Sequence, residues 1–76
     1  MPNMKTIKIN KQPIGLSQLL KFEALVSSGG EAKAVIDDGQ VLLNGEVETR
    51  RGKKVVSGDI VQFAGENYQV KLEASF

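Results

Sequence analysis

Residues 28–47, SGGEAKAVIDDGQVLLNGEV, predict a helix, a turn and a β-hairpin in direct succession. The first half begins with Ser28 and, three residues later, Glu31, which is the spacing of a capping box at a helix start. Gly39 supplies the left-handed residue that commonly ends a helix. The second half holds Asn44-Gly45 between apolar residues, which is the strongest short signal for a hairpin. A capped helix followed by a tight two-stranded hairpin is therefore expected here.

The flanking segments complete an α+β pattern. Ser17 is placed to cap a first helix, and Leu16, Leu19 and Leu20 form its apolar stripe. In the second helix, Ala32, Val35 and Ile36 repeat the same spacing. The two helices are expected to pack as an αα-hairpin. Alternation and turn signals predict strands at residues 5–9, 41–43, 46–47, 55–56, 60–63 and 68–72. We expect one domain, residues 1–76, with a two-helix hairpin packed on a small, mostly antiparallel β-sheet, and Phe22 and Phe63 in its core.

Composition excludes several classes of function. The 76 residues contain no cysteine and no histidine, which rules out disulfide scaffolds and thiolate metal sites and removes the commonest general base. No apolar run approaches the roughly 20 residues that span a bilayer, and the N-terminal segment lacks a signal-peptide pattern. No nucleophile is visibly paired with a base. We expect a cytoplasmic protein that is not an enzyme and that binds no cofactor, metal or membrane.

The positive charge is concentrated in one short segment. The chain has ten basic and nine acidic residues, a net charge of +1. Four basic residues lie within residues 50–54, here called the basic tip, so six others oppose nine acidic residues and leave the rest of the chain at −3. Gly52 lets the backbone turn, so that all four cations can converge. A compact cationic segment on an acidic body indicates a phosphate-bearing partner.

The order of elements, with four short motifs, resembles the S4 RNA-binding domain, also described as the alpha-L motif. The motifs are Val26-Ser27-Ser28, Asp38-Gly39-Gln40-Val41, Asn44-Gly45 and Gly58-Asp59-Ile60-Val61. The resemblance covers about residues 15–63. It is closest to small stand-alone bacterial S4-like proteins, in which residues 29–33 and 46–54 look like recurring signature stretches.

The resemblance implies a non-catalytic protein that binds structured RNA through the two helices and the hairpin. Ribosomal RNA and tRNA are both implied as partners, with association with the ribosome and no small-molecule substrate. The sequence does not distinguish ribosomal RNA, tRNA and a regulatory transcript. Carried over by position, and with Lys21 added from the first helix, the predicted RNA-binding residues are Lys21, Ser28, Gly29, Gly30, Lys33, Gln40, Asn44, Arg50, Arg51, Lys53 and Lys54. Most of these contacts suit phosphate better than bases.

Two cationic positions of many S4 domains are missing here. Gly15-Leu16-Ser17 stands where many members have Arg-Leu-Asp, and Gly29 stands where many have arginine. We therefore expect Lys33 and the basic tip to contribute most of the RNA contacts.

Simpler explanations exist for each predicted site residue. The basic tip also fits a solvated loop whose charge Glu46 and Glu48 offset, and residues 28–30 also fit a flexible capped turn. Lys33 has Asp37 four residues later as a surface partner. Asn44 suits the hairpin turn itself, and Gln40 suits a solvated surface. The alternative function is a protein-interaction adaptor whose acidic body docks a partner without RNA.

Overall fold

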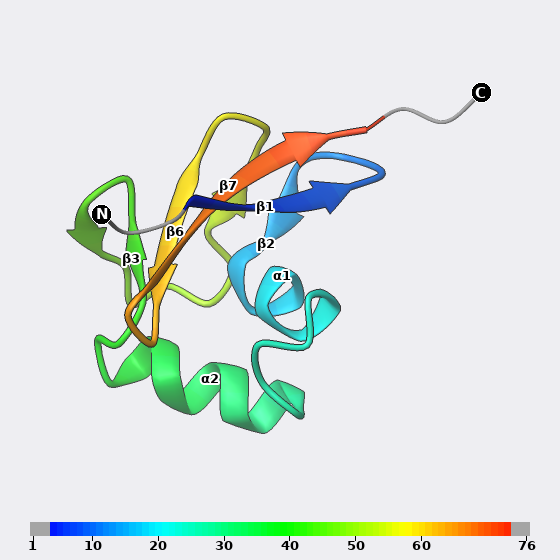
Figure 1. Cartoon of the computed structure of the whole chain (residues 1–76). Helices are drawn as coiled ribbons and strands as arrows, with labels where there is room; N and C mark the ends of the chain where they lie inside the picture. Colours follow the sequence, from blue (N-terminus) through cyan, green and yellow to red (C-terminus); the bar gives the residue numbers. More distant parts are fainter. Residues whose placement is uncertain (1–3, 74–76) are drawn as a thin grey trace.

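The computed structural model describes residues 4–73. Two helices lie beside a twisted sheet, with α1 and α2 packed against each other (Figure 1). The elements, in order, are β1 Met4–Ile9, β2 Ile14–Gly15, α1 Leu16–Phe22, α2 Gly29–Asp37, β3 Leu42–Leu43, β4 Glu46–Val47, β5 Lys54–Val55, β6 Ile60–Phe63 and β7 Glu66–Leu72.

The strands form two sheets. The larger has the order β1-β7-β6-β3-β4, and the smaller pairs β2 with β5. Within residues 4–73 the β1–β7 pair is parallel and all other pairs are antiparallel. The α+β class and the mostly antiparallel sheet are thus confirmed. The parallel pairing of the first and last strands was not predicted.

Local signals account for the limits of α2. Ser28 Oγ accepts a hydrogen bond from the Glu31 N–H at 3.1 Å, as the capping-box spacing predicts. The Glu31 carboxylate accepts from the Ser27 N–H at 2.6 Å, one residue earlier than the usual capping box. At the other end, Gly39 has φ +78° and its N–H donates to the Ile36 carbonyl. This left-handed residue ends the helix, as expected.

The prediction that Ser17 caps α1 is wrong. Gly15 occupies the N-cap position without a side-chain hydrogen bond, and Ser17 is the second helical residue. Distant carbonyls replace the cap: the Leu16 N–H donates to Lys53 O at 2.9 Å and the Ser17 N–H to Arg51 O at 3.1 Å. Because the basic tip satisfies these two N–H groups, α1 needs no capping side chain.

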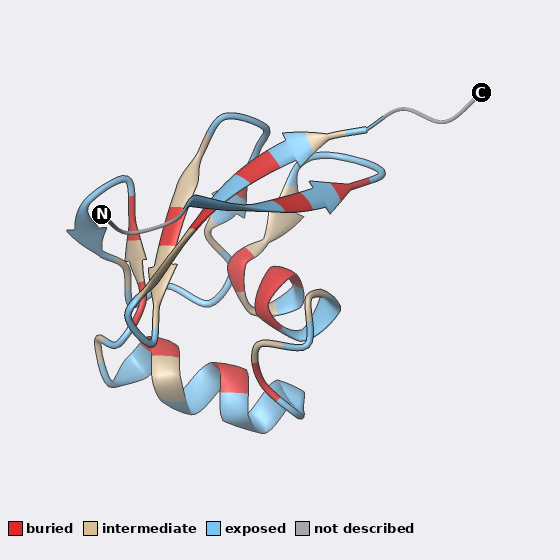
Figure 2. Ribbon diagram, viewed as in Figure 1, coloured by how far each residue is buried: buried red, intermediate tan, exposed pale blue. Residues whose placement is uncertain are grey.

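The core lies between the helices and the larger sheet. Figure 2 shows buried positions alternating along β1 and β7 and gathered on one side of each helix. The Leu16, Leu19 and Leu20 stripe of α1 is fully buried. Ala32 and Ile36 of α2 are fully buried as well. Both predicted helix stripes therefore face the core.

Phe22 is not a core residue. Its exposed fraction is 57%, whereas Phe63 packs, half-buried, against the core as expected. At roughly 100° per residue, Phe22 lies about 110° around α1 from the centre of the leucine stripe. The three leucines fill the contact with the sheet, and the phenyl ring is left outside it.

The bounds of four predicted strands differ from the prediction, and β2 was not predicted. The strands expected at residues 5–9 and 41–43 are β1 and β3, each of which begins one residue away from its expected start. The strand expected at residues 55–56 is β5, one residue earlier, and it pairs with β2 instead of joining the larger sheet. The strand expected at residues 68–72 is β7, which begins two residues earlier, at Glu66, because the turn lies at Ala64 and Gly65, which both have positive φ. The β2–β5 pair joins residues some 40 positions apart, beyond the reach of local patterns.

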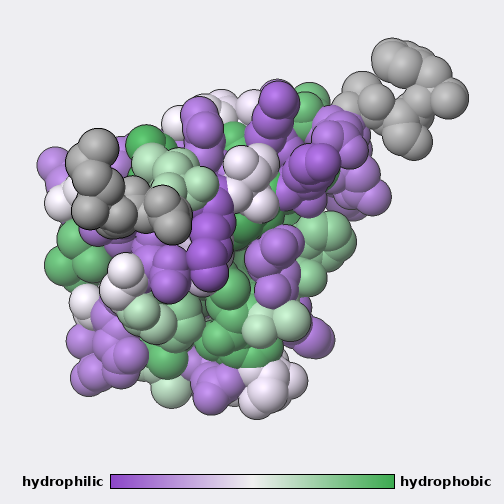
Figure 3. Space-filling view, in the orientation of Figure 1, coloured by the Kyte–Doolittle hydropathy of each residue, from purple (hydrophilic) through white to green (hydrophobic). Residues whose placement is uncertain are grey.

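Exposed hydrophobic residues are scattered over several elements. Met4, Phe22, Val47 and Val56 are the large ones among the described residues. In Figure 3, hydrophilic and hydrophobic residues are intermixed on the visible face. Isolated exposed apolar residues are common on folded proteins. In the part of the chain that the structure describes, no helix is both long and apolar enough to cross a membrane.

Candidate functional site

Three segments meet at the start of α1. The backbone hydrogen bonds from Leu16 and Ser17 attach α1 to the basic tip, and the β2–β5 pair sets Gly15 opposite Lys54. Helix α2 also packs against α1, and Gly29, Gly30 and Lys33 from its N-terminal part line the same hollow as residues of α1 and the basic tip. The tip and the two helix starts therefore enclose a common surface hollow.

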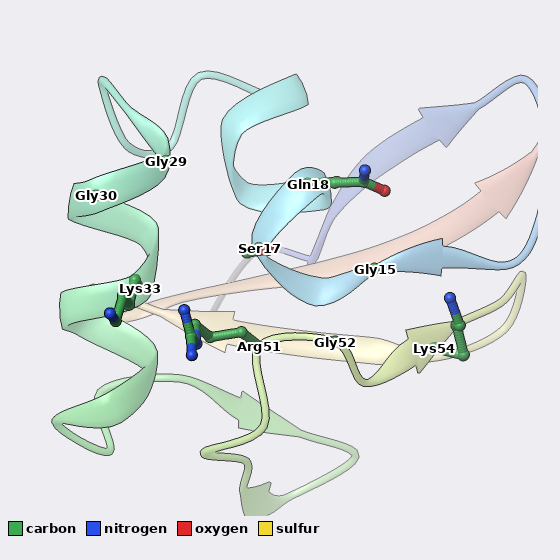
Figure 4. Close-up of a pocket in the computed structure, with 9 residues that line it drawn as sticks. All are labelled: Gly15, Ser17, Gln18, Gly29, Gly30, Lys33, Arg51, Gly52 and Lys54. Carbon is green, nitrogen blue, oxygen red and sulfur yellow. The ribbon is translucent and has the colours of Figure 1, made fainter.

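This hollow, here called the cationic groove, has a volume of about 550 Å³. Figure 4 shows it between the tip and α2, with the start of α1 along one side. Its lining residues are Gly15, Ser17, Gln18, Gly29, Gly30, Lys33, Arg51, Gly52 and Lys54.

The lining carries three positive charges and no negative charge. Lys33, Arg51 and Lys54 are its charged residues, and no aspartate or glutamate contributes. Arg51 reaches toward α2 and Lys33, while Lys54 lies at the other end (Figure 4). Within residues 4–73, none of the three makes an ion pair, so Lys33 does not pair with Asp37. Their charge is available to an anionic ligand.

The start of α2 adds polar donors to this groove. The N–H groups of Gly29 and Gly30 have no acceptor among the described residues, whereas the next N–H, of Glu31, donates to Ser28 Oγ. The first N–H groups of a helix have no partner inside the helix. They are therefore free for a ligand that accepts hydrogen bonds.

The structure does not bring all four cations of the tip together. Arg51 and Lys54 line the cationic groove, but Arg50 and Lys53 line a second hollow of about 310 Å³. That second hollow also contains Glu46 and Glu48. The two acidic and two basic residues of the second hollow balance each other, whereas the charged residues of the cationic groove are all basic. The convergence expected from the sequence is thus wrong for two of the four side chains.

Glu48 holds Arg50 in the second hollow. The Glu48 carboxylate accepts from Arg50 Nε at 2.9 Å, from Nη2 at 3.2 Å and from the Arg50 backbone N–H at 3.0 Å. These hydrogen bonds, the side-chain ones first, lower the pKa of Glu48 from its ordinary 4.5 to about 2. In turn, the carboxylate raises the pKa of Arg50. The predicted offset of tip charge by Glu48 is therefore present in the structure.

This ion pair gives a pH-dependent contribution to stability. A carboxyl group with a depressed pKa stabilises the fold above its unfolded pKa and loses that effect as the pH falls through the folded value. We therefore expect the stability difference between wild type and Arg50→Gln, measured by urea unfolding, to be constant above pH 4.5 and to vanish toward pH 2. In NMR titrations, the Glu48 pKa should be near 2 and should rise in Arg50→Gln. It should stay below 4.5, because the backbone N–H still donates. A wild-type pKa of 4.5 would contradict this account.

Four other predicted contact residues lie outside the cationic groove. Lys21 is exposed on α1. Ser28 Oγ serves as the α2 cap, and Gln40 Nε2 donates to Asp38 Oδ2 at 2.9 Å. Asn44 has φ +53° in the hairpin turn, and its Oδ1 accepts from the Ile60 N–H at 2.9 Å. Three of these side chains thus already have partners within the fold.

The cationic groove also contains residues that the sequence did not indicate. These are Gly15, Ser17, Gln18 and Gly52. Gly15 and Ser17 belong to the triplet where many S4 domains have Arg-Leu-Asp, so the resemblance could have pointed to them. Attention to charge alone missed them because neither is ionisable. Within residues 4–73, no cluster of three or more His, Cys, Asp or Glu side chains is arranged to hold a metal ion.

Sequence comparison finds relatives of this chain, two of them of similar length. A family model described as "S4 domain" matches residues 7–71. "Putative RNA-binding protein YbcJ" of Escherichia coli is 46% identical over 68 residues, covering 88% of this chain and 97% of YbcJ. "Probable ribosome maturation protein RlbA" of Bacillus subtilis is 41% identical over 59 residues, covering 78% of this chain and 83% of RlbA. A tyrosine–tRNA ligase of Ralstonia nicotianae is 39% identical over 59 residues, which are 15% of the ligase.

The fold agrees with these matches. The solution structure of E. coli YbcJ superimposes with a TM-score of 0.68 at 46% identity, covering 93% of this chain and 91% of YbcJ. That structure is described as revealing an alfaL motif involved in RNA-binding. The family match extends from β1 to β7 and includes every segment that lines the cationic groove. The chain therefore belongs to the S4 domain family.

Proposed function

We propose that this protein binds structured RNA without catalysing a reaction, and that the RNA phosphate backbone lies in the cationic groove. The observation that carries the proposal is the groove lining: three cations, no acidic residue and no internal ion pair for any of the three within residues 4–73. The names of YbcJ and the alfaL motif support the same ligand class.

The groove residues suit phosphate in different ways. The planar guanidinium of Arg51 can donate two hydrogen bonds to one phosphate, whereas Lys33 and Lys54 act as mobile point charges. Arg51 and Lys33 lie together and Lys54 lies apart (Figure 4), so the groove offers charge at two places along one strand. No aromatic side chain lines the groove to stack a base. Recognition should therefore depend on backbone shape more than on sequence.

The names of two relatives suggest which RNA to test first. RlbA is named for ribosome maturation, and the matched ligase is named for tRNA. RlbA is matched over most of its length, while the ligase is matched over a small part. We therefore propose ribosomal RNA as the first RNA to test. We also propose that binding takes place in the cytoplasm.

A salt series tests the proposal. Fluorescence anisotropy would compare an RNA hairpin from ribosomal RNA, a single-stranded RNA and a DNA duplex. We expect the hairpin to bind most tightly, and if three phosphates are neutralised the log–log salt slope should be roughly −2 to −3. A salt-independent affinity, or no binding to any of the three, would contradict the proposal. The adaptor alternative would then be tested by affinity capture from lysate, because an adaptor keeps its protein partner after ribonuclease treatment.

A further inference from the structure

The glycines of this chain fall into two groups of four. The first group lies in turns with φ between +78° and +98°, a region that favours glycine. Its members are Gly39, Gly45, Gly58 and Gly65. The backbone conformation alone explains why glycine stands at these four positions.

The second group has no such explanation, and every member lines the cationic groove. It consists of Gly15, Gly29, Gly30 and Gly52, none of which has positive φ. A Cβ atom would also fit at each. At Gly15 it would lie 3.5 Å from the nearest atom, at Gly30 3.8 Å, and at Gly29 and Gly52 no atom lies within 4 Å.

Glycine at two of these positions, Gly29 and Gly30, costs the fold stability. Gly29 and Gly30 are the first two residues of α2, where alanine would restrict the unfolded chain and favour the helix. The described residues provide neither a close contact nor a special dihedral angle in return. The reason for four bare positions on one surface should therefore lie in what occupies that surface.

We infer that Gly15, Gly29, Gly30 and Gly52 keep the groove floor as bare main chain, so that the sugar–phosphate strand of the RNA packs directly against it. The inference rests on the proposed function and adds a steric requirement to the electrostatic one. Lys33 and Arg51 at one end and Lys54 at the other draw the strand onto this floor. The unpartnered N–H groups of Gly29 and Gly30 then lie within reach of phosphate oxygens. A methyl group on the floor would hold the strand away from both.

The test uses four single variants, Gly15→Ala, Gly29→Ala, Gly30→Ala and Gly52→Ala. We expect each to fold, with Tm raised by about 2–6 °C for Gly29→Ala and Gly30→Ala and unchanged for Gly52→Ala. For Gly15→Ala, Tm should fall by a few degrees, because Gly15 is the N-cap of α1 and alanine is a poorer N-cap than glycine. Affinity for the RNA hairpin should fall by about 5–100-fold, the cost of forcing a methyl group into a packed contact. The salt slope should remain that of wild type, because every cation is still present. At Gly29 and Gly30, greater stability with weaker binding is the signature of this inference.

The control is Ala34→Ser, which adds one atom on the exposed part of α2 outside the groove. It should leave the affinity unchanged. If wild type binds RNA and loses binding when the groove cations are removed, but the alanine variants bind like wild type, the glycine inference fails and the proposed function stands. If wild type does not bind RNA, both fail. A marked fall in Tm at Gly29, Gly30 or Gly52 would show that the fold itself needs glycine there.

Discussion

Replacing Lys33, Arg51 and Lys54 together with glutamine should weaken binding of the RNA hairpin by at least about 100-fold. Each exposed charge–phosphate contact should contribute about 1 kcal/mol, and about 1.4 kcal/mol corresponds to tenfold in affinity. The three side chains make no ion pair within residues 4–73, so their removal should leave the fold intact. Anisotropy at fixed salt would measure the affinity, and circular dichroism would confirm folding.

A matched pair of double variants separates the groove from overall charge. Arg51→Gln/Lys54→Gln and Arg50→Gln/Lys53→Gln each remove one arginine and one lysine from the same five residues, but only the first pair lines the cationic groove. At about 1 kcal/mol per contact, Arg51→Gln/Lys54→Gln should lose about 30-fold in RNA affinity. The other double variant should lose much less. Equal losses of affinity would mean that the whole basic tip binds RNA, and would contradict the proposal that RNA binds in the cationic groove.

The Leu20→Ala variant should lose about 2–5 kcal/mol of unfolding free energy, the usual cost of such a cavity. Leu20 is fully buried between α1 and the rest of the core. A domain of this size has about 4–11 kcal/mol in total, so the variant should be partly unfolded near physiological temperature. Urea unfolding followed by circular dichroism would measure the loss.

Phe22→Ala, two residues away on the same helix, is the matched control. Its side chain is 57% exposed, so the loss should stay below about 1 kcal/mol although more atoms are removed. A loss of about 3–5 kcal/mol at Phe22, as for a buried aromatic residue, would contradict its placement outside the core. Together, Leu20→Ala and Phe22→Ala test whether the leucine stripe faces the core and Phe22 lies outside it, contrary to the sequence-based prediction for Phe22.

Local interactions made the helices and the hairpin predictable. Ser28 and Glu31 lie three residues apart and bond through the first turn of α2. Gly39 and Asn44-Gly45 take the positive φ values that their residue types favour. Each of these signals acts within a few residues and does not depend on the rest of the fold. The apolar stripes of both helices were predictable for the same reason, because helix periodicity alone decides which residues share a face.

Contacts between distant segments were not predictable. Nothing near Ser17 shows that the carbonyls of Arg51 and Lys53 will satisfy the first N–H groups of α1. The same contacts carry Gly15 and Gly52 into one hollow. A search for charged residues could find the cations of the site but not its uncharged floor.

The sequence by itself determined which segments become helices and hairpin, and that the positive charge is concentrated in residues 50–54. Only the tertiary structure decided where that charge points. Pairing of β5 with β2 buries Val55 and leaves Lys54 at the groove, while Glu48 binds Arg50 at the second hollow. Successive residues of a strand point to opposite faces, which separates Lys54 from the buried Val55 in β5. Arg50, Arg51 and Lys53 precede that strand, and their placement follows from the backbone hydrogen bonds to α1 and from the Glu48–Arg50 pair.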